Sequence, residues 1–102
     1  MKPSEALDRH RETIREILSR YPVANPRVFG SVARGEDGEE SDLDILVEFL
    51  ASDERAPTFT YFDLARMEIE LTRKTGVRVD IRLENGFPMR TRERIGRGAV
   101  PL

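Results

Sequence analysis

The sequence contains no cysteine and only one histidine, and these two shortages exclude several kinds of site. Without cysteine there are no disulfides, no thiolate metal centres and no iron–sulfur clusters. His10 stands alone in a charged run with a helical pattern, so we expect a surface residue there and not a zinc ligand. The lack of cysteine also fits a reducing compartment, and we expect a cytoplasmic protein.

Long hydrophobic runs and an excess of positive charge are missing as well. No apolar segment approaches the ~20 residues that cross a bilayer, and the polar first segment, MKPSEALDRH, does not resemble a signal peptide. The formal net charge is −2, whereas a dedicated nucleic-acid binder is usually clearly basic. We therefore expect no membrane association and no stable complex with nucleic acid.

The length of 102 residues predicts a single domain that spans residues 1–102. A chain of this size buries about two thirds of its unfolded surface, which suffices for one sheet covered by a few helices. No repeat, low-complexity segment or linker is visible. A separate substrate domain is not expected.

Apolar periodicity predicts two long helices and three strands. The first helix is expected from a cap at Ser4 to about Arg20. The second is expected at Tyr61–Thr75, between a Thr60/Asp63 capping box and Gly76, with Leu64, Met67, Ile69 and Leu71 as its apolar residues. The strands are expected at about Pro26–Phe29, Leu43–Leu50 and Val77–Leu83, with a short helix at Val32–Arg34. This order predicts an α/β (α+β) fold, in which a small mixed sheet has helices packed on one side.

The most informative segment is Gly30–Asp44, with the sequence GSVARGEDGEESDLD. Asp42 and Asp44 are two residues apart at a strand end, so their side chains point to the same face. Two adjacent carboxylates repel each other, and a divalent cation such as Mg²⁺ removes the conflict. The alternative is that Ser41 and Asp42 form a turn and cap before a strand and that Gly30 and Ser31 form a plain turn.

The residues at the start of this segment suit a phosphate group. Gly30 allows close backbone approach, and the Ser31 hydroxyl and the amides of the following short helix are donors. Arg34 is placed to reach a phosphate, although a plain surface cation is an equal alternative. The acidic run Glu36–Glu40 is expected to be a solvated loop.

The Gly-Ser turn followed about a dozen residues later by Asp-x-Asp resembles the signature of the DNA polymerase beta nucleotidyltransferase superfamily. The stretch GSVARGE…SDLDILVEF is especially similar to the minimal nucleotidyltransferases (MNT), the antitoxin partners of HEPN toxins. The similarity runs from Arg27 to Pro101. It implies a nucleotidyltransferase fold.

The resemblance also implies a third carboxylate, and Asp80 in the last predicted strand matches it. In such enzymes two Mg²⁺ ions bind the three aspartates and the triphosphate of ATP. Asp42 and Asp44 would then be shared metal ligands, and Asp80 a metal ligand and the base. The alternative for Asp80 is a solvent-facing residue, ion-paired with Arg78 and Arg82.

The activity implied by the resemblance is transfer of AMP from ATP to a hydroxyl, with release of pyrophosphate. The expected acceptor is a tyrosine of a cognate HEPN-type ribonuclease toxin encoded nearby, for which the chain would be the antitoxin. One alternative is modification of a small molecule, as in aminoglycoside nucleotidyltransferases. Another is a catalytically idle antitoxin that neutralises by binding.

Two further segments leave their roles open. Phe59, Tyr61 and Phe62 form an aromatic cluster that favours core packing, with stacking on adenine or contact with a partner as alternatives. The basic run Arg90–Arg97 contains Arg92, Arg94 and Ile95 and resembles the charged terminal helix of the MNT family. It could be a solvated helix or could face an acidic partner or the triphosphate, and Gly96 and Gly98 would weaken it.

Overall fold

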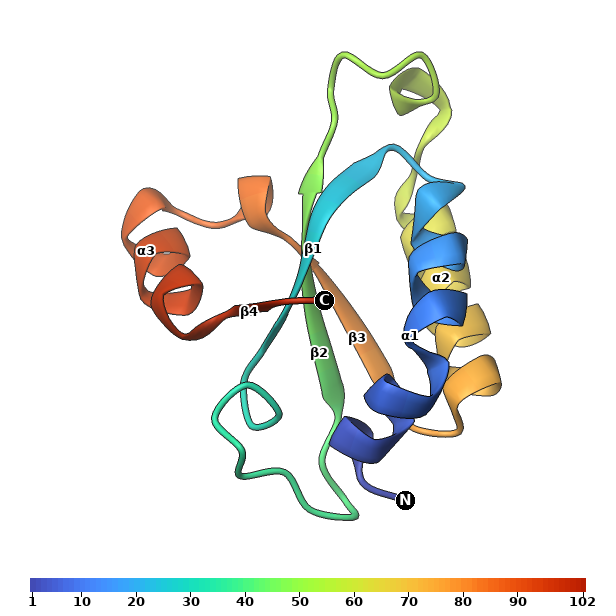
Figure 1. Ribbon diagram of the computed structural model, residues 1–102. Helices are drawn as coiled ribbons and strands as arrows, with labels where there is room; N and C mark the ends of the chain where they lie inside the picture. The colour runs from blue at the N-terminus through green and yellow to red at the C-terminus, as the bar shows by residue number, and fades with distance from the viewer.

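The computed structural model describes residues 1–102 and contains one four-stranded sheet (Figure 1). The strands are β1 (Val23–Phe29), β2 (Leu43–Phe49), β3 (Val79–Leu83) and β4 (Val100–Pro101), in the spatial order β3-β2-β1-β4. β1 is antiparallel to both β2 and β4, and β2 is parallel to β3. The predicted α+β fold with a small mixed sheet is confirmed.

Three helices pack with this sheet. Helices α1 (Pro3–Ser19) and α2 (Tyr61–Thr75) lie side by side on one face, as the sequence predicts (Figure 1). The shorter α3 (Met89–Gly98) lies on the other side of the sheet, where it contacts β1. None of them is long and apolar enough to cross a bilayer. The face opposite α1 and α2 is therefore the more open one.

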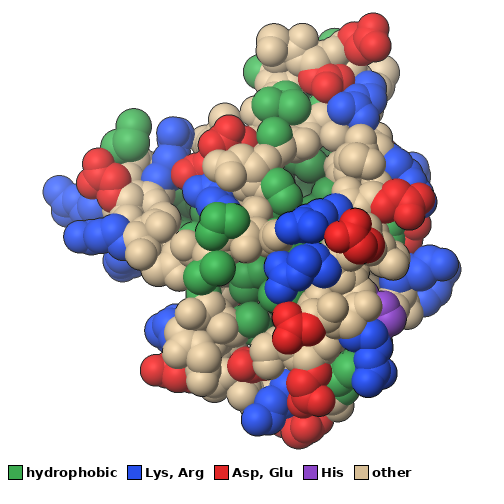
Figure 2. All heavy atoms as spheres, viewed as in Figure 1, with side chains coloured by type: hydrophobic (Ala, Val, Ile, Leu, Met, Phe, Trp, Pro, Cys, Tyr) green, Lys and Arg blue, Asp and Glu red, His purple; other side chains and the backbone are tan.

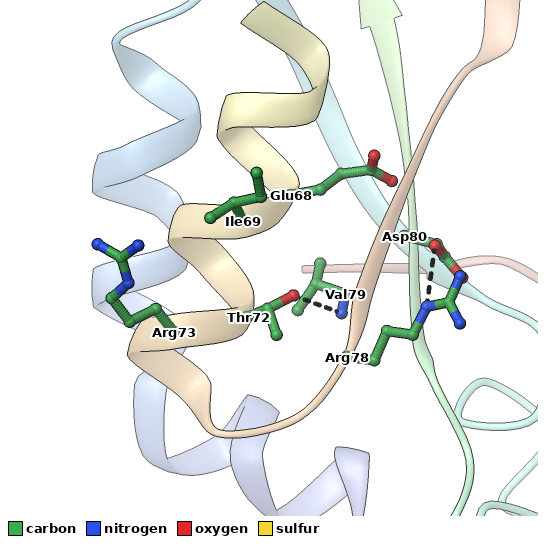
Figure 3. A pocket seen from close by; sticks show the side chains of 7 residues that line it. All are labelled: Glu68, Ile69, Thr72, Arg73, Arg78, Val79 and Asp80. Atoms are coloured by element: carbon green, nitrogen blue, oxygen red, sulfur yellow. Dashed lines mark hydrogen bonds and ion pairs between the residues drawn. The ribbon is translucent and has the colours of Figure 1, made fainter. Parts of the chain in front are cut away.

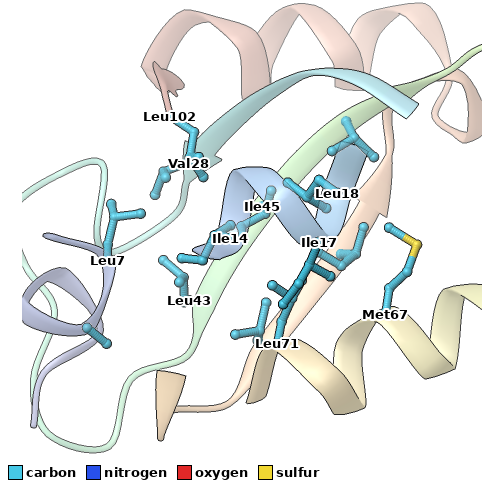
Figure 4. Packing of buried hydrophobic residues seen from close by; sticks show 14 of the residues in the cluster. Leu7, Ile14, Ile17, Leu18, Val28, Leu43, Ile45, Met67, Leu71 and Leu102 are labelled. Carbon is cyan, nitrogen blue, oxygen red and sulfur yellow. The ribbon is translucent and has the colours of Figure 1, made fainter. Parts of the chain in front are cut away.

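The hydrophobic core lies between the sheet and the two long helices (Figure 4). Leu43, Ile45 and Val47 of β2 alternate onto this side and are fully buried. Helices α1 and α2 cover them with side chains that include Ile14, Ile17, Met67 and Leu71. Burial of one such side chain contributes about 1.5–3 kcal/mol. The alternate residues of β2, among them Asp44, face away from this core.

The termini of α2 are those that the sequence predicts. The Thr60 N–H donates to Asp63 Oδ2 at 2.8 Å, which forms the capping box, and Gly76 ends the helix with φ of 79°. Ile69, expected as one of the apolar residues of this helix, is not buried in the core, because its side chain is 58% exposed. The stripe that α2 presents to the core is thus narrower than its apolar residues suggest.

Helix α1 begins at Pro3, so the predicted cap at Ser4 is wrong. Proline is favoured at the first helical position because it has no N–H that needs a partner. The Ser4 N–H instead donates to Asp37 Oδ2 at 2.9 Å, and this hydrogen bond lowers the pKa of Asp37. The N-terminal amino group also binds Glu39 at 2.6 Å. The acidic segment 36–40, expected as a solvated loop, is therefore tied to the start of α1.

Strand β1 is longer than predicted, because it continues across a bulge. Its pairing with β2 shifts between Ala24 and Arg27, and Asn25 has a positive φ of 52°. Pro26 lies in this irregularity, where a residue without an N–H is tolerated. Strand β3 begins at Val79, two residues later than predicted, and β2 ends at Phe49.

The last residues form a helix and a strand. The predicted basic helix exists as α3 and contains both Gly96 and Gly98. Strand β4 was not predicted, because two residues are too few to show a periodicity. It pairs with β1, and Leu102 follows with its N–H donated to Pro26 O at 3.0 Å and its side chain 5% exposed. The end of the chain thus completes one edge of the sheet and part of the core.

Candidate active site

The pairing of three strands brings the predicted site residues to one end of the sheet. Phe29 at the end of β1 lies opposite Asp44, so Gly30 follows directly beside this carboxylate. In the parallel pair, Asp44 lies opposite Asp80. Residues on paired strands that lie opposite each other point to the same face. Gly30, Asp44 and Asp80 therefore form a row across three neighbouring strands, and Asp42 precedes β2 at the same end.

Asp44 is the central carboxylate of this row, and its surroundings oppose its negative charge. Its pKa is raised above the usual value, because burial removes the group from water and Asp80 and Asp42 repel it. Arg82 and Arg34 act in the opposite direction. Binding of a cation or a proton would therefore stabilise the Asp44 carboxylate in this position. A divalent cation with oxygen ligands would meet this need.

Arg78 contacts both of the other aspartates, and Figure 3 shows its contact with Asp80. Its Nε is 3.9 Å from Asp42 Oδ2 and 3.7 Å from Asp80 Oδ1, and its side chain is 73% exposed. Exposed pairs with such long contacts are weak. Of the ion pairs in the alternative that makes Asp80 a solvent-facing residue, the one with Arg78 is present, but the guanidinium is not firmly held and the Asp80 side chain is only 19% exposed. Arg78 supplies a positive charge where the repulsion between carboxylates requires one.

The side chains present fit a hard cation by their chemistry but are not a closed cage. No group of three or more acidic, histidine or cysteine side chains is already gathered around one point. The donors are carboxylates on neighbouring strands, one of them with a raised pKa, and the cation between them, Arg78, is weakly held. Ligation would require these side chains to rotate toward each other and Arg78 to withdraw.

Gly30 is constrained by both its backbone and its neighbour. Its φ is +74°, and a Cβ atom at this position would lie 2.6 Å from Asp44 Oδ2. Other residues would be strained in this conformation and would also displace the carboxylate. The absence of a side chain at Gly30 therefore leaves room for the Asp44 carboxylate and also leaves the backbone accessible.

The turn after Gly30 is not the short helix that was predicted at Val32–Arg34. The N–H groups of Arg34, Gly35 and Glu36 donate back to Gly30, Val32 and Ser31, at 3.2, 3.1 and 2.9 Å. Gly35 then adopts a positive φ of 70°, which ends the helical path. The turn therefore has no helix dipole, and any phosphate here would be held by individual donors.

A cavity of about 440 Å³ lies between this turn and α3. Its lining includes Phe29, Gly30, Arg34, Arg94, Ile95 and Gly98. Arg34 is exposed, and its Nε contacts Glu36 at 3.0 Å. Positive side chains also gather over α3 on the left of Figure 2, whereas both signs are mixed elsewhere on this face. The cavity has the size of a small-ligand site and two arginines on its walls.

Arg94 joins the candidate site from a segment whose role was left open. The sequence singles out the basic helix but not which of its arginines faces the Gly30 turn. Arg34 and Arg94 line the same cavity because α3 lies on the open side of the sheet, near β1. Ser31 lies in the turn and is partly buried.

The aromatic cluster does not lie near the carboxylates. Phe59 packs against Tyr21 and Phe49, with ring centroids at 6.3 and 5.5 Å, whereas Tyr61 and Phe62 are 86% and 82% exposed. Phe49 is at the opposite end of β2, and a rise of about 3.3 Å per residue separates it from Asp44 by about 16 Å. Phe59 is partly buried and packs against the core, whereas the expected core packing is wrong for Tyr61 and Phe62. The cluster is too distant to stack on a nucleotide held at Gly30.

Comparison with known proteins gives consistent matches. The family model described as a nucleotidyltransferase domain matches residues 10–100. A "putative protein adenylyltransferase" of Methanocaldococcus jannaschii is 36% identical over 86 residues, which are 84% of this chain and 86% of that protein. The protein adenylyltransferase MntA of Thermococcus cleftensis is 38% identical over 73 residues, or 72% and 68% of the two chains. A solved "putative minimal nucleotidyltransferase" superposes with a TM-score of 0.79 at 44% identity, covering 97% and 95% of the two chains.

Proposed function

The chain belongs to the nucleotidyltransferase domain family and is a nucleotidyltransferase, and from this premise we propose that it transfers AMP from ATP to a hydroxyl group of a partner protein. The observation that carries the proposal is the row of Gly30, Asp44 and Asp80 across three paired strands. The names of two relatives as protein adenylyltransferases support a protein acceptor over a small molecule.

The three aspartates are proposed to carry the chemistry. Asp42, Asp44 and Asp80 would hold two Mg²⁺ ions, which neutralise the charge of the triphosphate and stabilise the entering and leaving oxygens. The raised pKa of Asp44 and the weak hold on Arg78 support a cation in this place.

The donor nucleotide is proposed to bind on the β1 side of the row. Gly30 leaves the backbone open to the triphosphate, Ser31 donates a hydrogen bond from its hydroxyl, and Arg34 supplies positive charge. Arg94 lines the same cavity from α3 and extends that charge. The cavity of about 440 Å³ gives the nucleotide room beside the carboxylates.

Transfer requires the acceptor to approach from the side opposite the leaving group. The acceptor oxygen bonds to the α-phosphorus while the bond to the oxygen that bridges to the β-phosphate breaks, and pyrophosphate leaves with the electron pair. Asp80 accepts the hydroxyl proton and passes it to solvent. The role as base is the one that the resemblance to the nucleotidyltransferase superfamily implies, and the place of Asp80 beside Asp44 supports it.

The acceptor is proposed to be a tyrosine of a HEPN-type ribonuclease toxin encoded nearby, which AMP would inactivate. The similarity of GSVARGE…SDLDILVEF to the antitoxin partners of such toxins supports this acceptor. The chain would then act as an antitoxin by modifying its partner. Neutralisation by binding alone is the competing function.

One experiment separates modification from binding alone. The protein is mixed with the HEPN-type protein, Mg²⁺ and α-labelled ATP, and label is expected on the partner at a tyrosine. Asp80→Asn should keep substantial ATP–Mg²⁺ affinity, because Asp80 serves the second metal and the acceptor hydroxyl more than the nucleotide, but should lose transfer. Cells that carry the toxin with Asp80→Asn should stop growing. If the variant protected cells as well as the wild type, binding alone would explain neutralisation.

A further inference from the structure

A second hollow lies on the far side of Asp80 from the Gly30 turn. It has a volume of about 340 Å³ and follows the free edge of β3 (Figure 3). Its walls are built by Glu68, Ile69, Thr72 and Arg73 of α2 on one side and by Arg78 and Asp80 on the other. One end of this groove, the β3 groove, therefore opens at the proposed base.

The floor of the β3 groove cannot accept an added strand. The Val79 N–H donates to Thr72 Oγ1 at 3.0 Å, and the Ile81 N–H donates to Glu68 Oε2 at 2.8 Å. Two donors of the strand edge are thus satisfied by side chains from α2. An occupant must bind through its side chains and not through backbone pairing.

The rim of the β3 groove combines one apolar side chain with two cations. Ile69 is 58% exposed; the exposed Arg73 lies with it on the α2 wall, and the exposed Arg78 lies on the other wall beside Asp80 (Figure 3). The carboxylate of Glu68 is engaged by the Ile81 N–H. A complementary ligand therefore presents an apolar side chain next to a negative charge.

The position of the groove fits the geometry of the transfer reaction. An in-line displacement places the entering and leaving oxygens on opposite sides of the phosphorus. The donor cavity adjoins Gly30 on the β1 side of the row. Asp80 lies at the other end of the row, on β3. The acceptor must then enter from the β3 side, where the groove lies.

We propose that the β3 groove is the docking site for the segment of the acceptor protein that carries the modified hydroxyl. That segment sets an apolar side chain on Ile69 and an acidic side chain on the neighbouring Arg73, and so brings the hydroxyl to Asp80. The proposal rests on the proposed AMP transfer to a partner protein. It adds the surface and the chemistry by which the partner is recognised.

The test uses paired variants on one helix. Ile69→Ser and Arg73→Glu change the groove, whereas Phe62→Ser and Arg66→Glu make the same changes at exposed positions of α2 outside it. With the HEPN-type protein as acceptor, each groove variant should raise the KM for the acceptor about tenfold, the effect of losing about 1.4 kcal/mol of binding. The controls should leave that KM unchanged. Calorimetry should give all four variants the wild-type affinity for ATP with Mg²⁺.

Two outcomes overturn different parts of the proposal. Unchanged KM for the acceptor in both groove variants, with active wild-type enzyme, would overturn the groove as the docking site. Wild-type protein that adds no AMP to the partner would overturn the proposed function. A photoreactive amino acid at position 69 or at position 62 separates these failures, because capture of the purified partner from 69 alone supports docking at the groove. Equal capture from both positions, or none from 69, overturns it.

Discussion

The absence of a side chain at Gly30 has two effects, one on its own backbone conformation and one on the Asp44 carboxylate. Its positive φ strains any other residue, and its missing Cβ leaves room for the Asp44 carboxylate. The sequence places Gly30 in a turn that allows close backbone approach to a phosphate, but it does not specify the positive φ. The second effect depends on the pairing of β1 with β2, which no local pattern contains.

Replacement of Gly30 should affect both stability and the site. We expect Gly30→Ala to lower the free energy of unfolding by about 1–2 kcal/mol, the cost of a left-handed conformation for a residue with a Cβ. The variant should also bind ATP with Mg²⁺ more weakly, because Asp44 must move. Gly38→Ala is the control, since Gly38 has no positive φ and a Cβ there would meet no atom within 4 Å. Urea denaturation and calorimetry check both effects, and equal behaviour of the two variants would contradict them.

Asp44→Asn should stabilise the protein when no metal is present. The pKa of Asp44 is raised in the folded state, so its ionised form destabilises the fold at neutral pH, and stability recovers as the pH falls through the raised pKa. Asparagine removes the charge and with it this pH dependence. Asp8→Asn, at an exposed position paired only with Arg11, is the matched control and should change little.

The measurement is urea denaturation of both variants in the presence of a chelator, at pH 7 and at lower pH. Asp44→Asn should be more stable than the wild type at pH 7, and the difference should shrink as the pH falls. A less stable variant at pH 7 would show that the carboxylate is favourably placed without a cation. Addition of Mg²⁺ should stabilise the wild type more than the variant.

The sequence places the candidate site residues on the faces of their strands one by one, but it does not give the contacts between them. The period of two places Asp42 and Asp44 on one face of the sheet. In β3 it places Asp80 on the face away from the buried Val79 and Ile81. The contact of Arg78 with both Asp42 and Asp80 depends on the register between β2 and β3. Arg94 depends on where α3 packs, which its own sequence does not specify.

At the scale of elements, the sequence predicts the features that depend on neighbouring residues better than those that depend on contacts with distant segments. The limits of α2 follow from a capping box and a glycine that lie within its own sequence. At the start of α1, Pro3 and Glu5 are local signals, but the partner of the Ser4 N–H is Asp37, far along the chain. Strand β4 pairs only with the edge of β1. The bulge at Asn25 and Pro26 likewise interrupts the alternation by which the first half of β1 could have been predicted.

The contribution of the last segment can be measured at Leu102. Its side chain is 5% exposed within the core cluster, so Leu102→Ala should lower the free energy of unfolding by about 2–5 kcal/mol. Val100→Ala is the control, because Val100 is 50% exposed and should cost little. Guanidinium denaturation provides the values. Similar losses for both variants would mean that Leu102 does not belong to the core.

The ion pair of Arg27 with Glu84 links β1 to the short 3-10 helix Glu84–Gly86 that precedes α3. The two side chains are only 14% and 20% exposed, with contacts of 3.3 and 2.6 Å. The Arg27 guanidinium holds the pKa of Glu84 below its usual 4.5. Its stabilisation is therefore complete above about pH 4.5 and is lost as the pH falls through the lowered pKa.

Glu84→Gln should make the stability of the protein less dependent on pH in this acidic range and lower it at pH 7. Glu12→Gln is the control, since Glu12 is 89% exposed in its pair with Arg15 and should change neither quantity much. Urea denaturation between pH 7 and pH 3.5 checks the prediction. A Glu84→Gln profile parallel to that of the wild type would contradict it.

In the molecule as a whole, the hydrophobic core and the candidate site lie on opposite faces of one sheet. Helices α1 and α2 cover one face, and the candidate site lies toward the other, at the end where β1 stops and β2 and β3 start. Binding at this site should therefore stabilise the fold without rearranging its core. The effect is a property of the folded chain as a unit.

We expect ATP with Mg²⁺ to raise the free energy of unfolding by about 2.7 kcal/mol at a ligand concentration of 100 times Kd. For a domain of this size, each 1 kcal/mol moves the melting temperature by about 4–8 °C. The double variant Asp42→Asn with Asp44→Asn should fold but show no such shift. Calorimetric melting scans of both proteins, with and without ligand, test this. An equal shift in the double variant would place the ligand elsewhere.

The parallel register of β2 and β3 has a consequence for misfolding. The same pairing that sets Asp44 beside Asp80 sets Leu43 beside Val79 and Ile45 beside Ile81. A slip of β2 by one residue would turn its aspartate inward and its core residues toward water. A chain with this one-residue slip therefore cannot persist as a stable protein with a displaced site, because it fails to bury its core. The burial of Leu43 and Ile45 thus also keeps Asp44 on the face of the candidate site.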